Sequence, residues 1–398
     1  MSLSLVPKLL YVGDVPVEAS YHGSALLFRL LEEYPEDRLQ VVEVPPWLSS
    51  AERRLPGVTY STTEIGISRL LQSRFARVYG SWLLRSNRMV GALSAIALKS
   101  KPEAILTVTH GYSWLIAAEF AMQHNLPLHL ILHDDWLSSV PMLSISRRRA
   151  ENLFRRYYRA ASSRLCVSPA MIESYREKYG IGGTLLYPSQ ARTAKALPLD
   201  RLRNSGKAKA FAYAGTLANL GYARAISSLS EVLEKCGGKL IIYGPINEDH
   251  AAALGLRRSN ITLRGFLSSG DLINELREVA DVLFLPMSFE PADRTQMQLC
   301  FPSKLTDYTS IGVPILIYGP PYCSAIRWAR DNPGVAETAE RDGADALRPA
   351  VEKLINDSHY RSGLAEGAAR AGGEFFSYEN AKRIFYGALC QNGREIQG

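Results

Sequence analysis

Residues 301–316 read Phe301-Pro-Ser-Lys-Leu-Thr-Asp-Tyr-Thr-Ser-Ile-Gly-Val-Pro-Ile-Leu316, a helix signal followed at once by a strand signal. Pro302 and Ser303 stand where a helix begins, because proline is tolerated at the first helical positions. Gly312 is typical of a helix end, and the apolar run after it is typical of a buried strand. The segment therefore predicts one helix–strand repeat of an α/β fold.

The same alternation extends over the rest of the chain. Strands that are apolar throughout indicate a sheet covered on both faces, and strand–helix–strand repeats join parallel strands. Strands are expected at Leu9–Asp14, Gln40–Pro45, Ala104–His110, Leu126–His133, Arg164–Ser168, Thr184–Pro188, Ala210–Ala214, Lys239–Tyr243, Ile261–Arg264, Asp281–Pro286 and Pro314–Tyr318. Helices are expected at Gly23–Tyr34, Ile67–Leu98, Tyr112–Gln123, Arg148–Ala160, Pro169–Tyr179, Tyr222–Lys235, Ser269–Val279, Pro302–Ile311, Ala344–Asn356, His359–Ala371 and Tyr378–Cys390.

This rhythm predicts an α/β protein with two Rossmann-like, doubly wound domains that face each other across a cleft. The first domain is expected at 1–195 and the second at 210–377. Residues 196–209 are polar and contain Pro198 and Gly206, so they are interpreted as a linker. A last amphipathic helix at 378–392 is predicted to pack back on the first domain.

Composition excludes several classes of protein. Of the 398 residues, 46% are apolar, which excludes a disordered chain. No run approaches 18 apolar residues, so no spanning helix is expected, and the N-terminus does not resemble a signal peptide. Five scattered cysteines without a CxxC pair argue against a disulfide framework or a zinc site. The expected location is the cytoplasm.

The net charge of +7 belongs to the first half of the chain. Residues 1–195 contain 23 Lys and Arg against 16 Asp and Glu, whereas the remainder contains 23 of each. No acidic residue lies between Glu64 and Glu103. Arginines fall on one side of a helical projection and apolar residues on the adjoining side: Arg74, Arg77, Arg85 and Arg88, then Phe75, Val78, Trp82, Met89 and Leu93.

Two interpretations of this basic segment remain open. A basic amphipathic helix is typical of contact with an anionic membrane surface. An ordinary sheet-packing helix with a solvated arginine face gives the same pattern. Arg147, Arg148 and Arg149 begin a second basic cluster, which Arg155, Arg156 and Arg159 continue. Binding of nucleic acid is not expected, because no recognisable binding module accompanies the charge.

The second half contains a candidate site for a nucleotide diphosphate. Gly215 ends a strand and lets the backbone approach an anion closely, and Thr216 offers a hydroxyl group. An ordinary strand–helix turn is the alternative. Ser303 lies at a predicted helix N-terminus beside Lys304, which together favour a phosphate. Asp307 lies one turn further on, where its carboxylate would accept hydrogen bonds from ribose hydroxyls.

The first half offers polar residues at the ends of two predicted strands. His110 ends one strand and His133 the next, where cleft residues belong in parallel sheets. Asp134 and Asp135 follow His133 and are candidates to orient an acceptor or take its proton. Histidines packed by hydrogen bonds are the alternative, and an Asp-Asp pair beside a histidine also fits a metal site.

The second half resembles the donor domain of GT-B glycosyltransferases, and more narrowly the retaining glycosyltransferase family 4. The resemblance covers roughly Phe211–Pro320 and lies in the order of several motifs. These are Ala-Gly-Thr at 214–216, Tyr-Gly at 243–244, Arg-Gly-Phe-Leu at 264–267, Ala-Asp-Val-Leu-Phe-Leu-Pro at 280–286, Pro-Ser-Lys-Leu-Thr-Asp-Tyr at 302–308 and Ile-Gly-Val-Pro at 311–314.

The resemblance implies a role for each matching residue. Gly215 and Thr216 would face the donor diphosphate, Ser303 and Lys304 would meet its phosphates, and Asp307 its ribose. The base pocket would be lined by Tyr243, Gly244, Arg264, Gly265, Phe266 and Leu267. In the first domain, Gly23 and Ser24 would cap the phosphates, and His133 would contact the transferred sugar. The family needs neither a metal nor another cofactor to hold the diphosphate.

The sequence also departs from the family pattern. Thr216 takes the place of a usual arginine, and residues 218–221 lack the usual lysine. The first glutamate of the E-x7-E motif falls on Leu299, and the second is shortened to Asp307. Lys304 is the candidate to supply the missing positive charge.

The expected function is a glycosyltransferase that moves a sugar from a nucleotide diphosphate to a hydroxyl of a glycan or lipid-linked acceptor, with retention. His133 and Lys304 are the candidate catalytic residues. His110, Asp134 and Asp135 are the candidate acceptor-binding residues. The alternatives are a nucleotide-sugar epimerase and a catalytically inactive GT-B-like binding protein. Expected partners are a nucleotide sugar, the acceptor and an anionic membrane surface.

Overall fold

The computed structural model describes residues 6–19, 22–63, 69–85, 90–194, 206–217, 220–267 and 269–390. The chain divides into two compact units. Unit 1 runs to Tyr187 and resumes at Ala381, and unit 2 comprises Pro188–Asn380. Most of the predicted linker, residues 196–205, lies outside the described residues, as do Arg88 and Met89.

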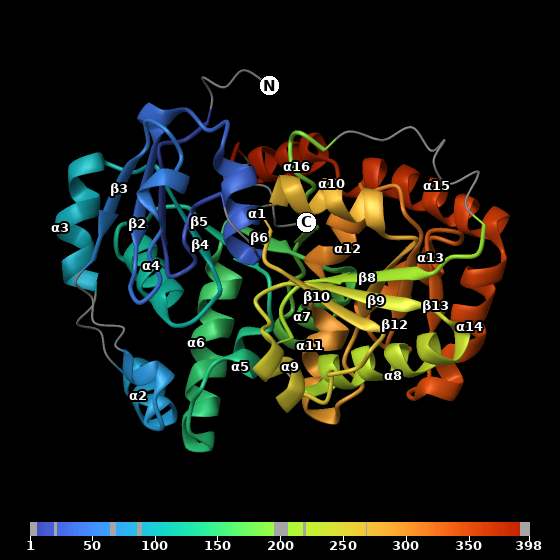
Figure 1. Cartoon of the computed structure of the whole chain (residues 1–398). Helices are drawn as coiled ribbons and strands as arrows, with labels where there is room; N and C mark the ends of the chain where they lie inside the picture. The colour runs from blue at the N-terminus through green and yellow to red at the C-terminus, as the bar shows by residue number, and fades with distance from the viewer. Residues whose placement is uncertain are drawn as a thin grey trace. The chain divides into compact units, whose positions relative to one another are not determined.

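The described part of unit 1 contains a seven-stranded parallel sheet in the order β3-β2-β1-β4-β5-β6-β7 (Figure 1). Each central strand is buried along its whole length, as the apolar runs predict. The strands are β1 Leu9–Gly13, β2 Leu39–Glu43, β3 Thr59–Thr62, β4 Ala104–Val108, β5 Leu128–Leu132, β6 Ser163–Cys166 and β7 Thr184–Leu185.

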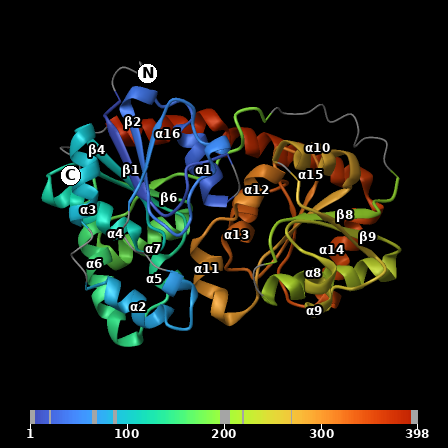
Figure 2. The ribbon, with the colours of Figure 1, turned by 60° about the vertical axis from the view of Figure 1, so that its left-hand side comes forward.

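Helices cover both faces of this sheet. The α-helices are α1 His22–Leu31, α2 Ala76–Leu83, α3 Val90–Ser100, α4 Ser113–Gln123, α5 Trp136–Ser139, α6 Arg147–Ala160 and α7 Pro169–Tyr179, with α16 Tyr378–Cys390 from the end of the chain. Short 3-10 helices are η2 Glu36–Arg38, η3 Ala51–Arg53, η4 Arg69–Gln72 and η5 Ser144–Ser146. Leu27 of α1 and Phe385 of α16 share one core with Tyr11 and Val41 of the sheet, so α1 and α16 lie on the same face (Figure 2).

Unit 2 repeats the architecture. Its described residues form a six-stranded parallel sheet in the order β10-β9-β8-β11-β12-β13. The strands are β8 Ala210–Ala214, β9 Lys239–Tyr243, β10 Ile261–Gly265, β11 Val282–Pro286, β12 Ile315–Tyr318 and β13 Glu337–Ala339.

Two helices, α8 and α14, pack together on one face of the unit 2 sheet and share its core. The helices of this unit are α8 Leu220–Cys236, α9 Glu248–Ala253, α10 Ser269–Val279, α11 Arg294–Leu299, α12 Ser303–Tyr308, α13 Ser324–Asp331, α14 Ala344–Asn356 and α15 Ser358–Phe375, with the 3-10 helix η7 Pro291–Asp293. The predicted α/β class, with two Rossmann-like doubly wound units, is confirmed.

The helical segment expected over Ile67–Leu98 consists of separate elements in its described part, which are η4, α2 and α3. Strands β3 and β13 were not expected. The ends of β3 are exposed and its middle residues are half-buried, and β13 has only three residues. Neither strand therefore has the continuous apolar run that marks an interior strand.

Candidate functional site

The strand order of each sheet marks where a ligand belongs. In unit 1 the chain leaves β1 toward β2 and β3, then returns to place β4 on the other side of β1. In unit 2, β8 and β11 have the same relation. Such a reversal opens a crevice at the carboxyl ends of the two neighbouring strands. The candidate ligand-binding residues are therefore those that follow β1 and β4, and those that follow β8 and β11.

Three glycines form the carboxyl edge of the unit 2 sheet. The amide of Gly215 donates to the carbonyl of Tyr243 at 2.8 Å, and the amide of Gly244 donates to the carbonyl of Gly265 at 2.8 Å. Gly215 and Gly244 both have φ of 149°, in the region that side chains avoid. A Cβ at Gly244 would overlap the carbonyl oxygen of Gly215. Both turns therefore require glycine.

Lys304 lies directly against the first of these turns. A Cβ built on Gly215 would overlap Cε of Lys304 and lie 2.8 Å from its Nζ. The Nζ also lies 5.7 Å from the centre of the Tyr213 ring. Burial lowers the pKa of Lys304 to about 8, with the carboxylate of Asp307 opposing the shift. This edge therefore presents a partly buried ammonium group beside a bare backbone turn, as an anion site requires.

The helix that holds Lys304 is shorter than expected. The prediction of a helix over Pro302–Ile311 is corrected to α12, which begins at Ser303 and ends at Tyr308. Thr309 and Ser310 follow it, and their hydroxyls donate back to the carbonyls of Thr306 and Asp307 at 2.7 Å each. So short a helix has a small macrodipole, and the positive charge at this edge therefore comes mainly from Lys304.

The residues that the family resemblance places near the base and the phosphates of a donor differ in exposure. The side chain of Tyr243 is buried, and its hydroxyl donates to Oε1 of Glu275 at 3.2 Å. Phe266, which follows β10, is 58% exposed. The carbonyl of Thr216 accepts a hydrogen bond from the Tyr213 hydroxyl at 2.7 Å, which fixes the loop after Gly215.

In unit 1, a carboxylate and an imidazole meet at the ends of β1 and β4. Oδ1 of Asp14 lies 3.2 Å from Nδ1 of His110. Asp14 is 2% exposed, and its backbone amide donates to Oγ of Ser113 at 3.0 Å. Gly111 has φ of 47°, and a Cβ there would overlap the Asp14 carboxylate. Glycine at position 111 therefore leaves room for the Asp14 carboxylate beside His110.

The charge of Asp14 changes the proton affinity of His110. Burial lowers the pKa of His110, but the hydrogen bond and charge of Asp14, with the charge of Asp134, outweigh burial and raise the pKa above 6.5. The carboxylate therefore orients the ring and favours its protonated form.

His133 has a different environment although it ends the next strand. Burial, opposed by Asp134, lowers the pKa of His133 to about 4, so its ring is neutral near pH 7. Its Nε2 is buried and has no hydrogen-bond partner among the described residues. A Cβ on Gly23 would lie 3.3 Å from its Nδ1, so His133 packs against the start of α1, where Ser24 also lies.

Asp135 is held by the fold. Its Oδ2 accepts from the amide of Ser138 at 3.1 Å and caps α5, and its Oδ1 accepts from the Tyr175 hydroxyl at 2.9 Å. Because both carboxylate oxygens bind groups of the protein, Asp134 is the better placed of the two aspartates to meet a ligand.

The comparisons with known proteins concern the fold of the chain. No family model and no curated protein matches the sequence. The solved structure of HepE from Anabaena in complex with UDP is similar, with a TM-score of 0.67 and 15% identity, over 96% of this chain and 100% of that chain. Sucrose-phosphate synthase from Thermosynechococcus elongatus gives 0.65 and 14%, over 94% and 96%. WaaG, a glycosyltransferase involved in lipopolysaccharide biosynthesis, gives 0.61 and 14%, over 95% and 99%.

This chain has the GT-B glycosyltransferase fold. The resemblance read from the motifs of the second half is thereby confirmed for the fold. At identities of 14–15%, the structural similarity is evidence for the fold alone.

Sequence reasoning missed two residues at the edges of the GT-B units. Asp14 follows β1 directly, but a single aspartate after a strand has no spacing that would distinguish it. Glu290 lies after β11 and pairs with Arg224 of α8. Strand ends in a doubly wound sheet are the one signal that would have found both.

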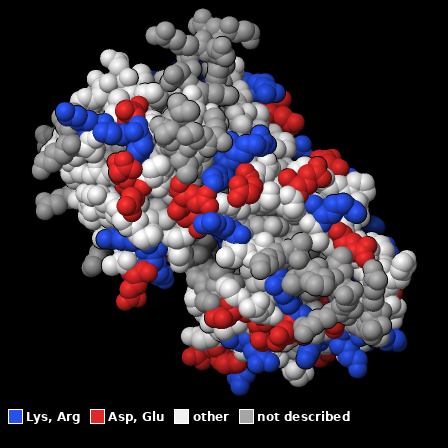
Figure 3. Space-filling view, turned by 90° about the horizontal axis from the view of Figure 1, so that it is seen from above, with Lys and Arg blue, Asp and Glu red and all other residues white. Residues whose placement is uncertain are grey.

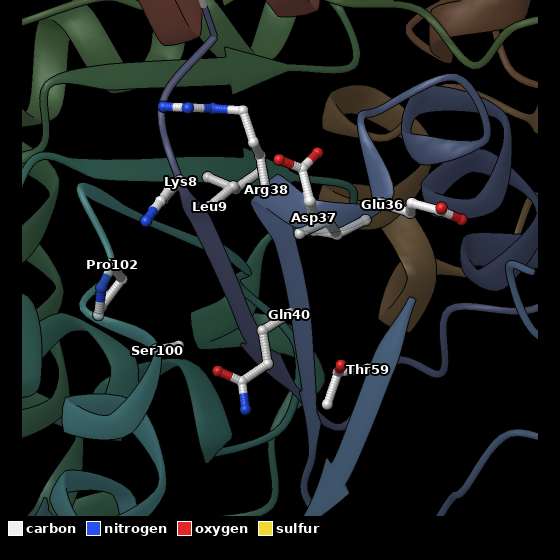
Figure 4. Close-up of a pocket in the computed structure, with 10 residues that line it drawn as sticks. Lys8, Leu9, Glu36, Asp37, Arg38, Gln40, Thr59, Ser100 and Pro102 are labelled. Carbon is white, nitrogen blue, oxygen red and sulfur yellow. The ribbon is translucent and has the colours of Figure 1, made fainter. Parts of the chain in front are cut away.

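The described residues offer little evidence for other ligand sites in the GT-B units. No cluster of three or more His, Cys, Asp or Glu side chains suited to a metal ion occurs among the described residues. A cavity of about 320 Å³ lies at the amino ends of β1, β2 and β3, the edge opposite His110 (Figure 4). Lys8, Arg38 and Gln40 contribute to its lining. Arg38 is held there by the carbonyl of Val6 and by Glu103, so it serves the fold.

Proposed function

We propose that the protein is a glycosyltransferase that moves a sugar from a nucleotide diphosphate to a hydroxyl of a glycan or lipid-linked acceptor. The observation that carries this proposal is the Lys304 ammonium group held against the Gly215 turn, on a GT-B fold. A partly buried cation costs free energy unless a counter-charge meets it, and a donor diphosphate would supply that charge.

The chemistry follows from that ammonium group. As the bond from the sugar C1 to the diphosphate breaks, negative charge grows on the leaving group. A fixed cation and backbone amides stabilise this charge more than they stabilise the ground state, which lowers the barrier. Lys304 and Ser303 would supply this stabilisation without a metal, beside the Gly215 turn. Retention of configuration is part of the proposal and rests on the family resemblance.

Unit 1 is proposed to bind the sugar and the acceptor. His133 is neutral near pH 7, so its ring nitrogens would donate to or accept from sugar hydroxyls without adding charge. Asp134 would orient the acceptor hydroxyl. His110, oriented by Asp14, would be a candidate to take the acceptor proton when it is neutral. Gly23 and Ser24 would contact donor phosphates.

A panel of nucleotide sugars tests donor binding. UDP-glucose is the first to try, because HepE has been solved with UDP and with UDP-glucose. A ligand that binds only the folded state raises the melting temperature. We expect one or more of the UDP-, GDP- and ADP-linked sugars to raise it for the wild type and not for Lys304→Ala. If no member of the panel raises it, the proposed function is wrong.

Turnover separates the enzymatic proposal from its alternatives. Release of nucleoside diphosphate that increases with added acceptor is the expected result, and His133→Ala is expected to reduce it while donor binding persists. Binding without turnover would instead indicate a non-catalytic protein. Release that needs no acceptor and yields an epimerised free sugar would indicate an epimerase.

The proposed setting is the cytoplasm, with transient contact between the protein and an anionic membrane surface. No helix in the described part of the chain is long and apolar enough to cross a membrane. In this setting, the proposed lipid-linked acceptor would be met at the bilayer surface.

A further inference from the structure

Helix α2 exposes its apolar side chains. Phe75 is 51%, Val78 57% and Trp82 52% exposed. A helix that packs on a sheet would bury such a stripe. The interpretation of this segment as an ordinary sheet-packing helix is therefore wrong for α2, although it holds for α3, where Leu93 is buried.

The exposed face continues onto the start of α6. The amide of Leu143 donates to Oγ of Ser81 at 2.9 Å, and Nε of Arg149 donates to the carbonyl of Leu84 at 2.8 Å. Ile145, in η5 between these two contacts, is 80% exposed. Both ribbon views place α2 beside α6 (Figure 1, Figure 2). We call this region the α2–α6 surface; its apolar members are Phe75, Val78, Trp82 and Ile145.

The charged members of the α2–α6 surface are nearly all arginines. Those exposed on α2, its flanks and α6 are Arg74, Arg77, Arg85, Arg147, Arg148, Arg149, Arg155, Arg156 and Arg159. The acidic residue among them is Glu151, which already pairs with Arg155 and Lys178. By contrast, acidic and basic side chains are interspersed on the face seen in Figure 3. The α2–α6 surface therefore carries a strong positive charge, which Glu151 offsets only in small part.

Part of this charge lines an open groove. Arg148, Arg149 and Arg156 surround a hollow of about 450 Å³ on α6, with Asn152 and Leu153 completing it. Guanidinium groups bind phosphate through paired N–H donors, which lysine cannot do. The groove thus suits a phosphate group, and the apolar side chains near it suit acyl chains just below such a group.

We propose that the α2–α6 surface docks on a bilayer that contains anionic phospholipid. Phe75, Val78, Trp82 and Ile145 would enter the region between headgroups and acyl chains, and the arginines would bind lipid phosphates. The ring of Trp82 stacks on that of Tyr79 at 5.4 Å, and such amphipathic rings are favoured at the headgroup level.

Two other occupants fit less well. In a two-fold dimer this surface would face itself, and its arginines would repel one another. Single-stranded nucleic acid needs aromatic platforms along the groove, whereas Val78 and Ile145 are aliphatic and cannot stack on bases. The mixture of exposed aliphatic, aromatic and guanidinium groups matches a lipid surface better than either.

The position of this surface suits a membrane-bound acceptor. Tyr112, two residues after His110, donates its hydroxyl to the carbonyl of Pro141 at 2.6 Å, just before η5. A Cβ on Gly80 of α2 would overlap the same hydroxyl. The docking surface therefore adjoins the edge that carries His110. Delivery of an acceptor to that edge rests on the proposed function, whereas lipid binding does not.

Vesicle flotation with the full chain tests the proposal. We expect the wild type to float with phosphatidylcholine vesicles containing about 30% phosphatidylglycerol, to bind pure phosphatidylcholine weakly, and to be released by high salt. Phe75→Ser/Val78→Ser/Trp82→Ser and Arg148→Gln/Arg156→Gln should each reduce the partition coefficient roughly tenfold or more. The control Arg257→Gln/Arg341→Gln removes the same charge from exposed positions of unit 2 and should bind as the wild type does.

Other measurements keep the result interpretable. Each variant should melt as the wild type does and keep its response to nucleotide sugars, which separates lost docking from lost folding or a failed donor site. A blue shift of fluorescence on anionic vesicles, absent in Trp82→Phe, would place that ring in the lipid. The proposal is overturned if the wild type does not float, if both sets of variants float as the wild type does, or if light scattering shows a dimer that the α2 variant abolishes.

Discussion

At the scale of single residues, Lys304 links donor binding to pH. Its pKa of about 8 reflects burial, and a bound diphosphate would favour the charged form. We predict that the affinity for the nucleoside diphosphate falls as pH rises from 7 to 9, because the lysine loses its proton. The affinity of Lys304→Arg for the nucleoside diphosphate should not change over this range, since arginine stays charged. Calorimetric titrations at several pH values measure this, and equal pH profiles would contradict it.

The same burial predicts an effect on stability. A folded-state pKa below the ordinary 10.5 means that the ammonium group destabilises the fold. The penalty is fully present below pH 8 and disappears above pH 10.5. Lys304→Met should therefore raise the free energy of unfolding at pH 7 by about 1–3 kcal/mol while it removes donor binding. Urea unfolding measures the first effect, and a less stable variant would refute the prediction.

Asp14 offers a test of the pair at the edge of unit 1. Asp14→Asn keeps the shape but removes the charge, so burial should then lower the pKa of His110 below 6.5. A raised pKa contributes stability that is present below pH 6.5 and lost at higher pH. The variant should therefore be destabilised more at pH 6 than at pH 9. NMR titration of the His110 ring measures the pKa, and an unchanged value would show that Asp14 does not control it.

At the scale of elements, α16 completes the core of unit 1. Phe385 is fully buried there beside α1 and the sheet. Phe385→Ala should cost about 3–5 kcal/mol, because large-to-small changes in a core leave a cavity. Scanning calorimetry should show a lower transition temperature for unit 1. The exposed Glu379 on the same helix supplies the control Glu379→Ala, which should shift it little. Equal shifts would show that α16 is dispensable for this core.

How far the elements were predictable depends on their burial. β1, β4, β5, β8 and β11 were predicted because an interior parallel strand must be apolar on both faces. The edge strand β3 was missed because it faces solvent in part. The burial of the segment from 67 to 98 stayed open because Phe75, Val78 and Trp82 have core-like spacing, and sequence alone does not tell whether an apolar stripe is buried.

At the scale of the whole molecule, the excess positive charge and the proposed donor site lie in different halves of the chain. The positive excess of the first half gathers on the α2–α6 surface, whereas the proposed donor site depends on Lys304 in the electrically balanced second half. Gly215 and Lys304 were predictable because they occur in ordered motifs. The Asp14–His110 pair was not, because its members lie 96 residues apart and meet only through strand order.

Calorimetric titration with UDP, GDP and ADP tests the central claim that Lys304 and the Gly215 turn form a nucleoside diphosphate site. Lys239→Ala is the matched control, since Lys239 is exposed at the amino end of β9, the opposite edge of the same sheet. We predict that at least one nucleotide binds the wild type and Lys239→Ala equally, and binds Lys304→Ala roughly 10- to 100-fold more weakly. Equal affinity of the wild type and Lys304→Ala, or no binding of any of the three, would contradict the account.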